Sequence, residues 1–253
     1  MNIRQQKIKD LINETGAAKL SELEVMFPDY SSMTIRRDLE MLETLGEVVR
    51  TRSGAKSIAH LTRLNEPLYS ERARERIAEK ADIAKKAQGL IEQGSSVFLD
   101  AGTTVTELAK LLANNKLFVI TTAPNIALEC VKHADVSVFM TGGHLSSGNL
   151  SVSGVNAISF LDQINIDTAF MATSGVNVKN GFTSGSYDES RIKMRAIEKA
   201  SKVVMLMDSS KYGKSLPFTY ASLSDINIMI TDDKIDRGFL EELQKHGVET
   251  LVT

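Results

Sequence analysis

Six short, largely apolar runs between residues 97 and 230 constrain the fold of this chain more than any other feature. They are VFL (97–99), LFVI (117–120), VSVFM (136–140), TAFMA (168–172), VVMLM (203–207) and INIMI (226–230). Short apolar runs of this kind are typical of strands buried on both faces. Segments with helical spacing alternate with them, near residues 104–114, 124–133, 188–200 and 236–246. This alternation indicates an α/β domain with a mostly parallel sheet.

The first 58 residues have a different rhythm, which predicts three short helices and a hairpin. Gly16 ends the first helix, and Pro28-Asp29 ends the second. The third is capped by Ser31 or Ser32, and one face carries the apolar residues Ile35, Leu39, Leu42 and Leu45. After Gly46, short β-prone stretches flank Ser53-Gly54, as in a β-hairpin or wing.

These patterns divide the chain into two domains. We expect a helical domain with a wing over residues 1–58, a linker over 59–70 and an α/β domain over 71–253. The linker segment, AHLTRLNEPLYS, has no clear period and contains Pro67. A helix of roughly residues 71–92 should open the second domain, with Ile77, Ala81, Ala84 and Ile91 on one stripe.

The third helix has the layout of a DNA recognition helix. Its apolar stripe leaves Thr34, Arg36 and Arg37 on other faces near the helix start, where such a helix contacts base edges. Arginine pairs bidentately with guanine, and hydroxyls reach bases or phosphates. The predicted DNA-binding residues are Ser32, Thr34, Arg36, Arg37, Arg50, Arg52 and Lys56. Residues 1–56 hold nine Lys/Arg and nine Asp/Glu, so a helical bundle with a solvated arginine face is the alternative.

The segment VFLDAGTT (97–104) has the form of an anion-binding turn. A strand ends at Asp100, Gly102 allows close approach of backbone N–H groups, and the hydroxyls of Thr103 and Thr104 add donors at a helix start. A tight turn with a threonine N-cap is the alternative. Five of the six apolar runs end in Thr, Ser, Gly or Asp clusters, which suggests a polar crevice at the carboxyl ends of the strands. The predicted ligand-binding residues are Asp100, Gly102, Thr103, Thr104, Thr121, Gly142, Gly143, Gly175 and Lys211.

Both halves resemble the DeoR/GlpR-type transcriptional regulators. The N-terminal match is Thr34-Ile35-Arg36-Arg37-Asp38-Leu39 followed by Arg50 and Gly54-Ala55, and the C-terminal landmarks include Asp100-x-Gly102-Thr103-Thr104, Gly142-Gly143 and Asp208-Ser209-Ser210-Lys211. The resemblance implies a winged helix-turn-helix and a sensor related to ribose-5-phosphate isomerase and CoA-transferase-like proteins. It also implies a sugar-phosphate ligand at Asp100, Gly102, Thr103, Thr104 and Lys211. Three departures stand out: a longer turn at Pro28–Ser31, Ser53 in place of a glycine, and Ala123-Pro124-Asn125 where an asparagine usually follows the threonine.

The leading hypothesis is a DNA-binding transcriptional regulator, a repressor of a sugar or carbohydrate operon that responds to a phosphorylated effector. One alternative is an isomerase or CoA-transferase-like enzyme with an accessory helical domain, in which Asp100, Lys211 and Glu189 would transfer protons. A protein-interaction module is another. A TIRRDL-like helix has no use in sugar isomerisation, and an interaction module leaves the arginines unexplained, so we expect a regulator and not an enzyme.

Composition and the remaining residues indicate the class of protein and the compartment in which it works. Apolar residues make up 42% and charged residues 25%, which is typical of a folded chain, and the net charge is −2. The single cysteine, Cys130, excludes internal disulfides and is expected to fill the core. The four histidines show no metal-ligand spacing, so no metal or cofactor is expected. Without a signal peptide or membrane span, we expect a cytoplasmic protein, and reading two DNA half-sites requires a homo-oligomer, a dimer or tetramer.

Overall fold

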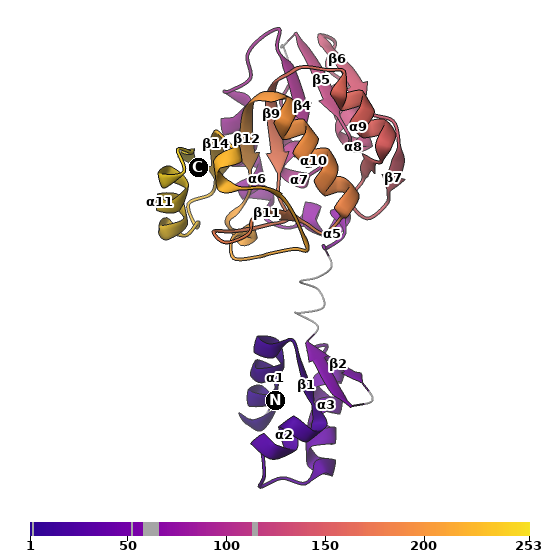
Figure 1. Cartoon of the computed structure of the whole chain (residues 1–253), viewed down its shortest axis with the longest axis vertical. Coiled ribbons are helices and arrows are strands. Elements are labelled where there is room, and N and C mark those ends of the chain that lie inside the picture. Colours follow the sequence, from indigo (N-terminus) through magenta and orange to yellow (C-terminus); the bar gives the residue numbers. More distant parts are fainter. Residues whose placement is uncertain (2, 52, 58–65, 113–115) are drawn as a thin grey trace. The chain divides into compact units, whose positions relative to one another are not determined.

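The computed structural model describes residues 1–253 except for residues 2, 52, 58–65 and 113–115 (Figure 1). The chain divides into two compact units, Met1–Asn65 and Glu66–Thr253. The second unit therefore includes Glu66–Ser70, which the sequence pattern assigns to the linker. Arg52, one of the predicted DNA-binding residues, lies outside the described residues.

The described residues of the first unit form three helices and a small antiparallel sheet. The helices are α1 (Ile3–Thr15), α2 (Leu20–Met26) and α3 (Ser32–Thr44). The strands are β1 (Ala17–Lys19), β2 (Val48–Thr51) and β3 (Gly54–Ser57), in the order β1-β3-β2. The three helices and the hairpin confirm the sequence prediction, whereas β1 was not predicted because three residues are too few to show a period.

The core of this unit is formed by one apolar stripe from each helix. Ile8, Ile12, Leu23, Ile35 and Leu42 are fully buried, and the hairpin adds Val48 and Ala55. The prediction that Leu45 shares this face is wrong, because its side chain is 52% exposed. Leu45 is the C-cap of α3, where the chain leaves the helix for the left-handed turn at Gly46 (φ 72°).

The second unit is built on a seven-stranded sheet in which every pairing is parallel. Its order is β15-β14-β12-β9-β4-β5-β6. The strands are β4 (Ser96–Leu99), β5 (Leu117–Thr121), β6 (Val136–Met140), β9 (Ile166–Ala172), β12 (Ala200–Leu206), β14 (Ile228–Thr231) and β15 (Glu249–Val252). The six apolar runs are confirmed as strands. The seventh, β15, is an edge strand whose mixed sequence carries no apolar run.

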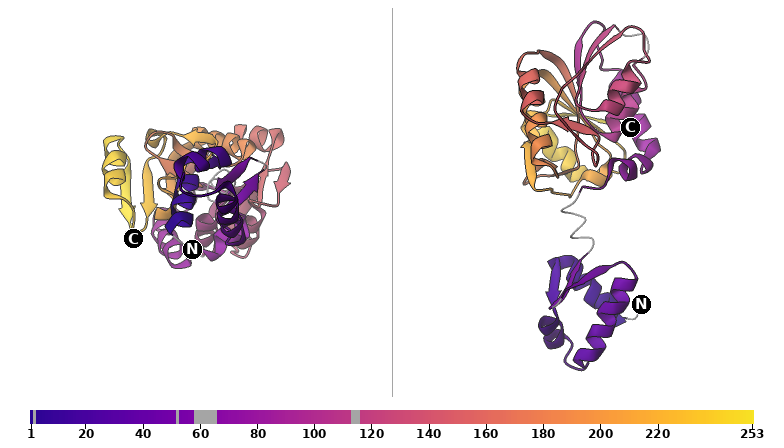
Figure 2. Two further views of the ribbon diagram at one scale, coloured as in Figure 1. Left: turned by 90° about the horizontal axis from the view of Figure 1, so that it is seen from below. Right: turned by 90° about the vertical axis from the view of Figure 1, so that its right-hand side faces the viewer.

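Helices cover both faces of this sheet, as the right-hand view of Figure 2 shows. On one face α6 (Ile77–Gln88), α7 (Thr103–Ala109) and α8 (Pro124–Cys130) pack on Val97, Leu99 and Phe170. On the other, α9 (Val155–Asp162), α10 (Tyr187–Lys199) and α11 (Arg237–Lys245) pack on Phe98, Met171 and Met205. Consecutive residues of the central strands thus enter different cores, which explains their apolar runs. The expectation of burial on both faces is wrong for the edge strand β6, where Phe139 and Met140 are 46% and 48% exposed.

Short strands lie beyond the carboxyl ends of the large sheet. A hairpin is formed by β7 (His144–Ser146) and β8 (Ser151–Ser153), and a three-stranded antiparallel sheet by β10 (Gly175–Asn177), β11 (Gly181–Ser184) and β13 (Phe218–Ala221). The sequence patterns did not predict these short strands. These short strands lie next to the edge at which all seven parallel strands end.

The helix predicted over residues 71–92 is interrupted, which corrects that prediction. It forms α5 (Tyr69–Arg74) and α6, separated by the extended residue Glu75 and by Arg76 in the left-handed conformation (φ 48°). The Lys80 ammonium donates to the carbonyls of Arg72 and Glu75 at this interruption, and the Arg72 carbonyl also accepts from the Glu75 N–H at 3.3 Å. Ile77, expected on the buried stripe, is 60% exposed as a result. The interruption turns α5 over the carboxyl edge of the sheet, where it contacts α7.

The position of Cys130 leads to a chemical prediction. Its side chain is fully buried at the end of α8, and burial raises the pKa of the thiol to about 12. Because the thiolate is the reactive form, the native protein should not react with an aromatic disulfide reagent at about pH 8, whereas the denatured chain should release one equivalent. Absorbance of the released thiolate measures this; rapid reaction of the native protein would show that the α8 packing opens in solution.

Candidate DNA-reading face and effector pocket

The start of α3 is shaped by its N-cap. The Ser31 hydroxyl accepts a hydrogen bond from the Thr34 N–H at 3.3 Å, which satisfies one of the free N–H groups of the first turn. From there Ile35, Leu39 and Leu42 point into the core, so the intervening residues must point outward. Ser32, Arg36 and Arg37 are exposed, and Thr34 is half-buried.

A buried ion pair holds α3 against α1. The Asp38 carboxylate, 3% exposed, accepts from Arg4 at 2.5 and 3.1 Å and from the Gln5 amide at 3.0 Å. The acid within the TIRRDL run is therefore structural, and it fixes the rotation of the helix that carries the arginines. Across the described part of the chain, Arg36 and Arg37 make no hydrogen bond or ion pair, so their guanidinium groups are available to a partner.

The wing residues differ in their availability. The Arg50 guanidinium lies 2.7 Å from Glu40 and 3.9 Å from Glu43 of α3, and the backbone N–H of Arg50 donates to the Glu43 carboxylate at 3.0 Å. Its charge is thus partly compensated within the unit. Lys56 is exposed on β3, and no acceptor is found for it among the described residues. Arg36, Arg37 and Lys56 are the predicted cations that the structure leaves uncompensated.

The second site lies at the carboxyl ends of β4 and β9. Asp100, 2% exposed, directly follows β4, and its carboxylate accepts from the Lys193 ammonium of α10 and from the Ala172 N–H at 2.9 Å. Lys193 also donates to the Ala172 carbonyl at 3.0 Å and lies 5.3 Å from the centre of the Tyr220 ring. The Tyr220 hydroxyl donates to the same carbonyl at 2.9 Å, and burial raises the pKa of this phenol.

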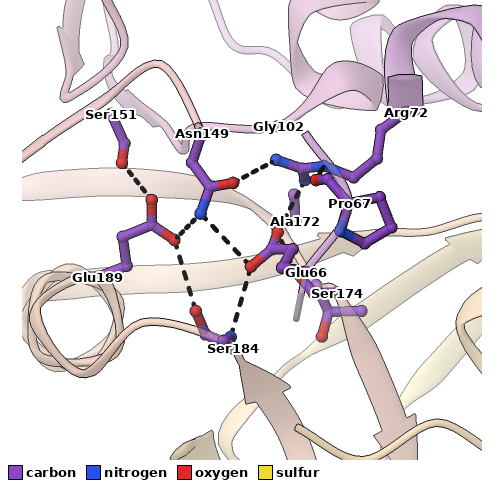
Figure 3. Close-up of polar contacts among 12 residues, drawn as sticks. Glu66, Pro67, Arg72, Gly102, Asn149, Ser151, Ala172, Ser174, Ser184 and Glu189 are labelled. Atoms are coloured by element: carbon purple, nitrogen blue, oxygen red, sulfur yellow. Dashed lines mark hydrogen bonds and ion pairs between the residues drawn. The ribbon is translucent and has the colours of Figure 1, made fainter. Parts of the chain in front are cut away.

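Beside this pair lies a small polar pocket (Figure 3). It is lined by Glu66, Arg72, Ala101, Asn149, Ala172, Thr173, Ser174, Glu189 and Lys193. The Asn149 side chain connects its parts: its oxygen accepts from Arg72 at 3.0 Å, and its amide donates to Glu189 at 3.0 Å. Glu189 also accepts from the Ser151 hydroxyl of β8. The side chains come from segments far apart in the sequence, which meet here because the parallel strands end at one edge.

The loop after β4 borders this pocket through Ala101. An added Cβ on Gly102 would lie 2.4 Å from the Ala172 Cβ, so only glycine allows β4 and β9 to end this close together. Among the described residues, no partner is found for the N–H groups of Gly102, Thr103 and Thr104, nor for the two threonine hydroxyls. Both threonines are largely buried. The loop therefore offers a group of free donors, as the sequence pattern suggests.

Other predicted ligand residues have structural roles. The Thr121 hydroxyl donates to the Leu99 carbonyl at 2.7 Å and accepts from the Ala123 N–H at 3.0 Å. Gly143 (φ 140°) leaves no room for a Cβ, which would meet the Ser153 carbonyl oxygen at 2.3 Å. An added Cβ on Gly175 would lie 2.9 Å from the Cβ and the carbonyl oxygen of Lys214. Gly142 is exposed. None of these four lines the pocket.

Lys211 lies apart from the loop after β4. It follows β12, close to Asp208, Arg72 and Glu75, and burial lowers the pKa of its ammonium group. No hydrogen bond joins it to any described residue through its side chain, and it does not line the pocket. The lysine that contacts Asp100 is Lys193, which the sequence reasoning did not select.

Sequence reasoning also missed Glu66, Arg72 and Asn149. Glu66 falls within the expected linker. Arg72 falls within a predicted helix of which only the apolar residues were considered, and Asn149 falls within a loop that contains no motif. Glu189 was considered under the enzyme alternative, as a group that would transfer protons. One sequence signal could have indicated a pocket residue, namely a charged residue among the buried positions of a predicted helix. Lys193 shows this signal, because it lies next to the buried Ile192 on α10.

Comparisons with known proteins agree with this geometry. A model of the DeoR-like helix-turn-helix domain matches residues 4–60, and one of the DeoR C terminal sensor domain matches residues 75–233. The chain belongs to the DeoR family of transcriptional regulators. It is 34% identical to the HTH-type transcriptional regulator GlpR of Haloferax volcanii over 97% of this chain and 95% of that protein. It is 30% identical to a putative aga operon transcriptional repressor of Escherichia coli O157:H7 over 98% and 93%.

A solved structure, ribose 5-phosphate isomerase A from Methanocaldococcus jannaschii, is similar over 53% of each chain, with 20% identity and a TM-score of 0.39. The family membership identifies this DeoR-family chain as a regulator and not an enzyme. Among the described residues, no group of three or more His, Cys, Asp or Glu side chains is placed to hold a metal ion, and no helix is both long and apolar enough to cross a membrane.

The Asp100–Lys193 pair should dominate the stability of the sensor. Substituting Lys193→Met leaves a buried carboxylate without its cation, and we expect a loss of about 3–5 kcal/mol in the free energy of unfolding. Urea denaturation followed by circular dichroism measures it. Arg195→Ala on the same helix, which removes exposed ion pairs with Asp162 and Glu198, should cost far less stability. Equal losses for the two variants would contradict a special role for the buried pair.

Proposed function

We propose that this protein represses a sugar or carbohydrate operon and is controlled by a phosphorylated small-molecule effector. The observation that carries the proposal is the group of unpartnered donors at Gly102–Thr104 beside a polar pocket, in a chain whose other unit presents free arginines on a recognition helix. The first feature fits an anionic ligand, and the second fits DNA.

Two relatives support the repressor role and the class of operon. The putative aga operon transcriptional repressor carries that role in its name, as does the HTH-type transcriptional repressor GlcR of Bacillus subtilis, 33% identical over 87% of this chain and 84% of that protein. We extend the repressor role to this chain because the two relatives match 98% and 87% of it.

The loop after β4 has the chemistry of a phosphate site. Three backbone N–H groups and two threonine hydroxyls converge there without protein acceptors, and a phosphate offers three oxygens that accept such bonds. Lys211, whose side chain has no acceptor among the described residues, supplies a cation if the ligand extends toward the end of β12. We assign the phosphate to Gly102, Thr103 and Thr104, with Asp100 holding Lys193 in place below it.

The rest of the pocket suits a polyhydroxylated body. Glu189 and Asn149 present oxygen acceptors and amide donors, and Ser151 adds a hydroxyl. A sugar presents hydroxyls that both donate and accept, so it can replace the hydrogen bonds that these residues now make to one another. A purely apolar ligand would leave several of them buried without partners, at about 1–3 kcal/mol each.

On DNA, Arg36 and Arg37 would read base edges, while Thr34, Ser32, Arg50, Arg52 and Lys56 would contact the backbone. A single recognition helix covers few base pairs, so we propose a homodimer or tetramer that reads two half-sites. The compensated charge of Arg50 suggests that it contributes less to phosphate binding than Lys56.

Substituting Arg36→Ala or Arg37→Ala should each weaken binding to the operator by about 1–3 kcal/mol, the value of a bidentate base contact. The DNA upstream of the protein's own gene is the first target for mobility-shift titration. Arg191→Ala, which removes an exposed arginine of the sensor, is the matched control and should leave affinity unchanged. Wild-type affinity in both α3 variants would exclude α3 as the recognition helix.

The effector site is tested by a thermal-shift screen of sugar phosphates against the corresponding free sugars. A ligand at 100 times its dissociation constant stabilises the protein by about 2.7 kcal/mol. Thr103→Val and Thr104→Val should each weaken binding by about tenfold to a hundredfold, since a hydrogen bond to a charged group contributes about 1.5–3 kcal/mol.

Thr219→Val, at an exposed position of β13, serves as the control and should not change the shift. Equal shifts from the phosphorylated and free sugars would refute a phosphate site at this loop. Conversion of the ligand during incubation would contradict the assignment as a regulator.

A further inference from the structure

The Glu66 carboxylate sits in a cradle of four hydrogen-bond donors (Figure 3). One oxygen lies 2.9 Å from the Arg72 guanidinium and accepts from the Ser174 hydroxyl. The other accepts from the Asn149 amide and the Gly185 N–H, each at 3.4 Å. The Glu66 and Arg72 side chains are only 7% and 9% exposed. Four donors from four separate segments around one carboxylate constitute a built oxyanion site.

Glu66 belongs to no helix or strand and occupies this cradle through its side chain. It is the first residue of the sensor unit, directly before Pro67 and α5. The next contacts along the chain also hold this segment to the pocket walls: the Pro67 carbonyl accepts from Arg72 at 3.0 Å, and the Tyr69 N–H donates to the Gly148 carbonyl at 2.7 Å.

The charges around the pocket indicate that the Glu66 carboxylate leaves when an anion enters. With Glu66 in place, its wall and floor carry three carboxylates, Glu66, Asp100 and Glu189, against two cations, Arg72 and Lys193. An anion would enter a site with an excess of one negative charge. If Glu66 leaves, the charges balance at two and two, and Arg72 loses its partner while it remains next to Asn149.

We propose that this cradle is an oxyanion subsite of the effector pocket and that Glu66 fills it as an internal competitor until the effector arrives. An oxyanion of the ligand, a phosphate or a carboxylate, takes the bonds from Arg72, Ser174 and Asn149, and the planar guanidinium fork suits either group. Glu66 then moves out together with the start of the sensor unit. Because the chain leads from Glu66 back to the DNA-reading unit, this movement is the first step of the signal. The inference rests on the proposed function and specifies how its site is regulated.

The test compares the full-length wild type with Glu66→Gln, which keeps the side-chain shape but removes the competing charge. Glu71→Gln is the matched control: it removes an exposed carboxylate from the same segment, where Glu71 caps the Leu68 N–H at 3.1 Å. The probes are fructose 6-phosphate, fructose 1,6-bisphosphate, 6-phosphogluconate and inorganic phosphate, titrated by calorimetry. Fructose 1,6-bisphosphate and 6-phosphogluconate each carry two anionic groups. They distinguish a ligand that spans loop and cradle from one that binds through a single phosphate.

If Glu66 occupies the site for about 90% of the time in the wild type, its removal tightens binding about tenfold, because apparent affinity scales with the open fraction. Glu71→Gln should bind as the wild type does. A second measurement needs no variant: hydrogen exchange at residues 66–74 of the wild type should accelerate when the best probe is bound, since the Tyr69 N–H loses its fixed partner.

Binding to Glu66→Gln that is equal to or weaker than binding to the wild type, with unchanged or slower exchange at residues 66–74, would overturn the competitor role while leaving the effector site intact. Failure of every probe to bind both the wild type and Glu66→Gln would overturn the proposed effector class together with this inference.

Discussion

The buried Asp100–Lys193 ion pair is the interaction on which the sensor depends. It joins the end of β4 to α10 and, through the Ala172 N–H and carbonyl, to the end of β9. Asp100 lies 72 residues before Ala172 and 93 residues before Lys193, and hydrophobic packing alone would not fix the ends of these segments relative to one another. By placing one cation and one carboxylate below the pocket, the pair sets both its floor and its charge.

The DNA-reading unit also contains an ion pair that joins two of its elements. There the Arg4–Asp38 pair ties α1 to α3 and orients a helix whose neighbouring arginines stay free. In both units one buried ion pair positions the groups that a partner would meet, while those groups keep few internal contacts. Glu66 and Arg72 are the exception, since each compensates the other inside the pocket. That exception is why the pocket can respond to a ligand.

The apolar runs and the helix-cap signals predicted the main elements well because both are local. Leu99, Phe170 and Met205 are buried wherever a parallel sheet forms, and Ser31 caps α3 through a bond three residues away. The pocket could be predicted only in part. Asp100 and the donors of the loop after β4 follow a strand directly, whereas Lys193 and Asn149 reach the pocket from a helix and a loop whose positions depend on the whole fold.

By itself, the sequence determined the two-unit organisation, the parallel sheet and the presence of a recognition helix, because periodicity, turn residues and the TIRRDL run act over a few residues each. Only the tertiary structure decided which charges meet. It paired Asp100 with Lys193, compensated Arg50 with Glu40, set Lys211 apart from the loop after β4 and placed Glu66 in the Arg72 cradle. Ion pairs between distant segments depend on how strands and helices align in space, and no local pattern encodes that alignment.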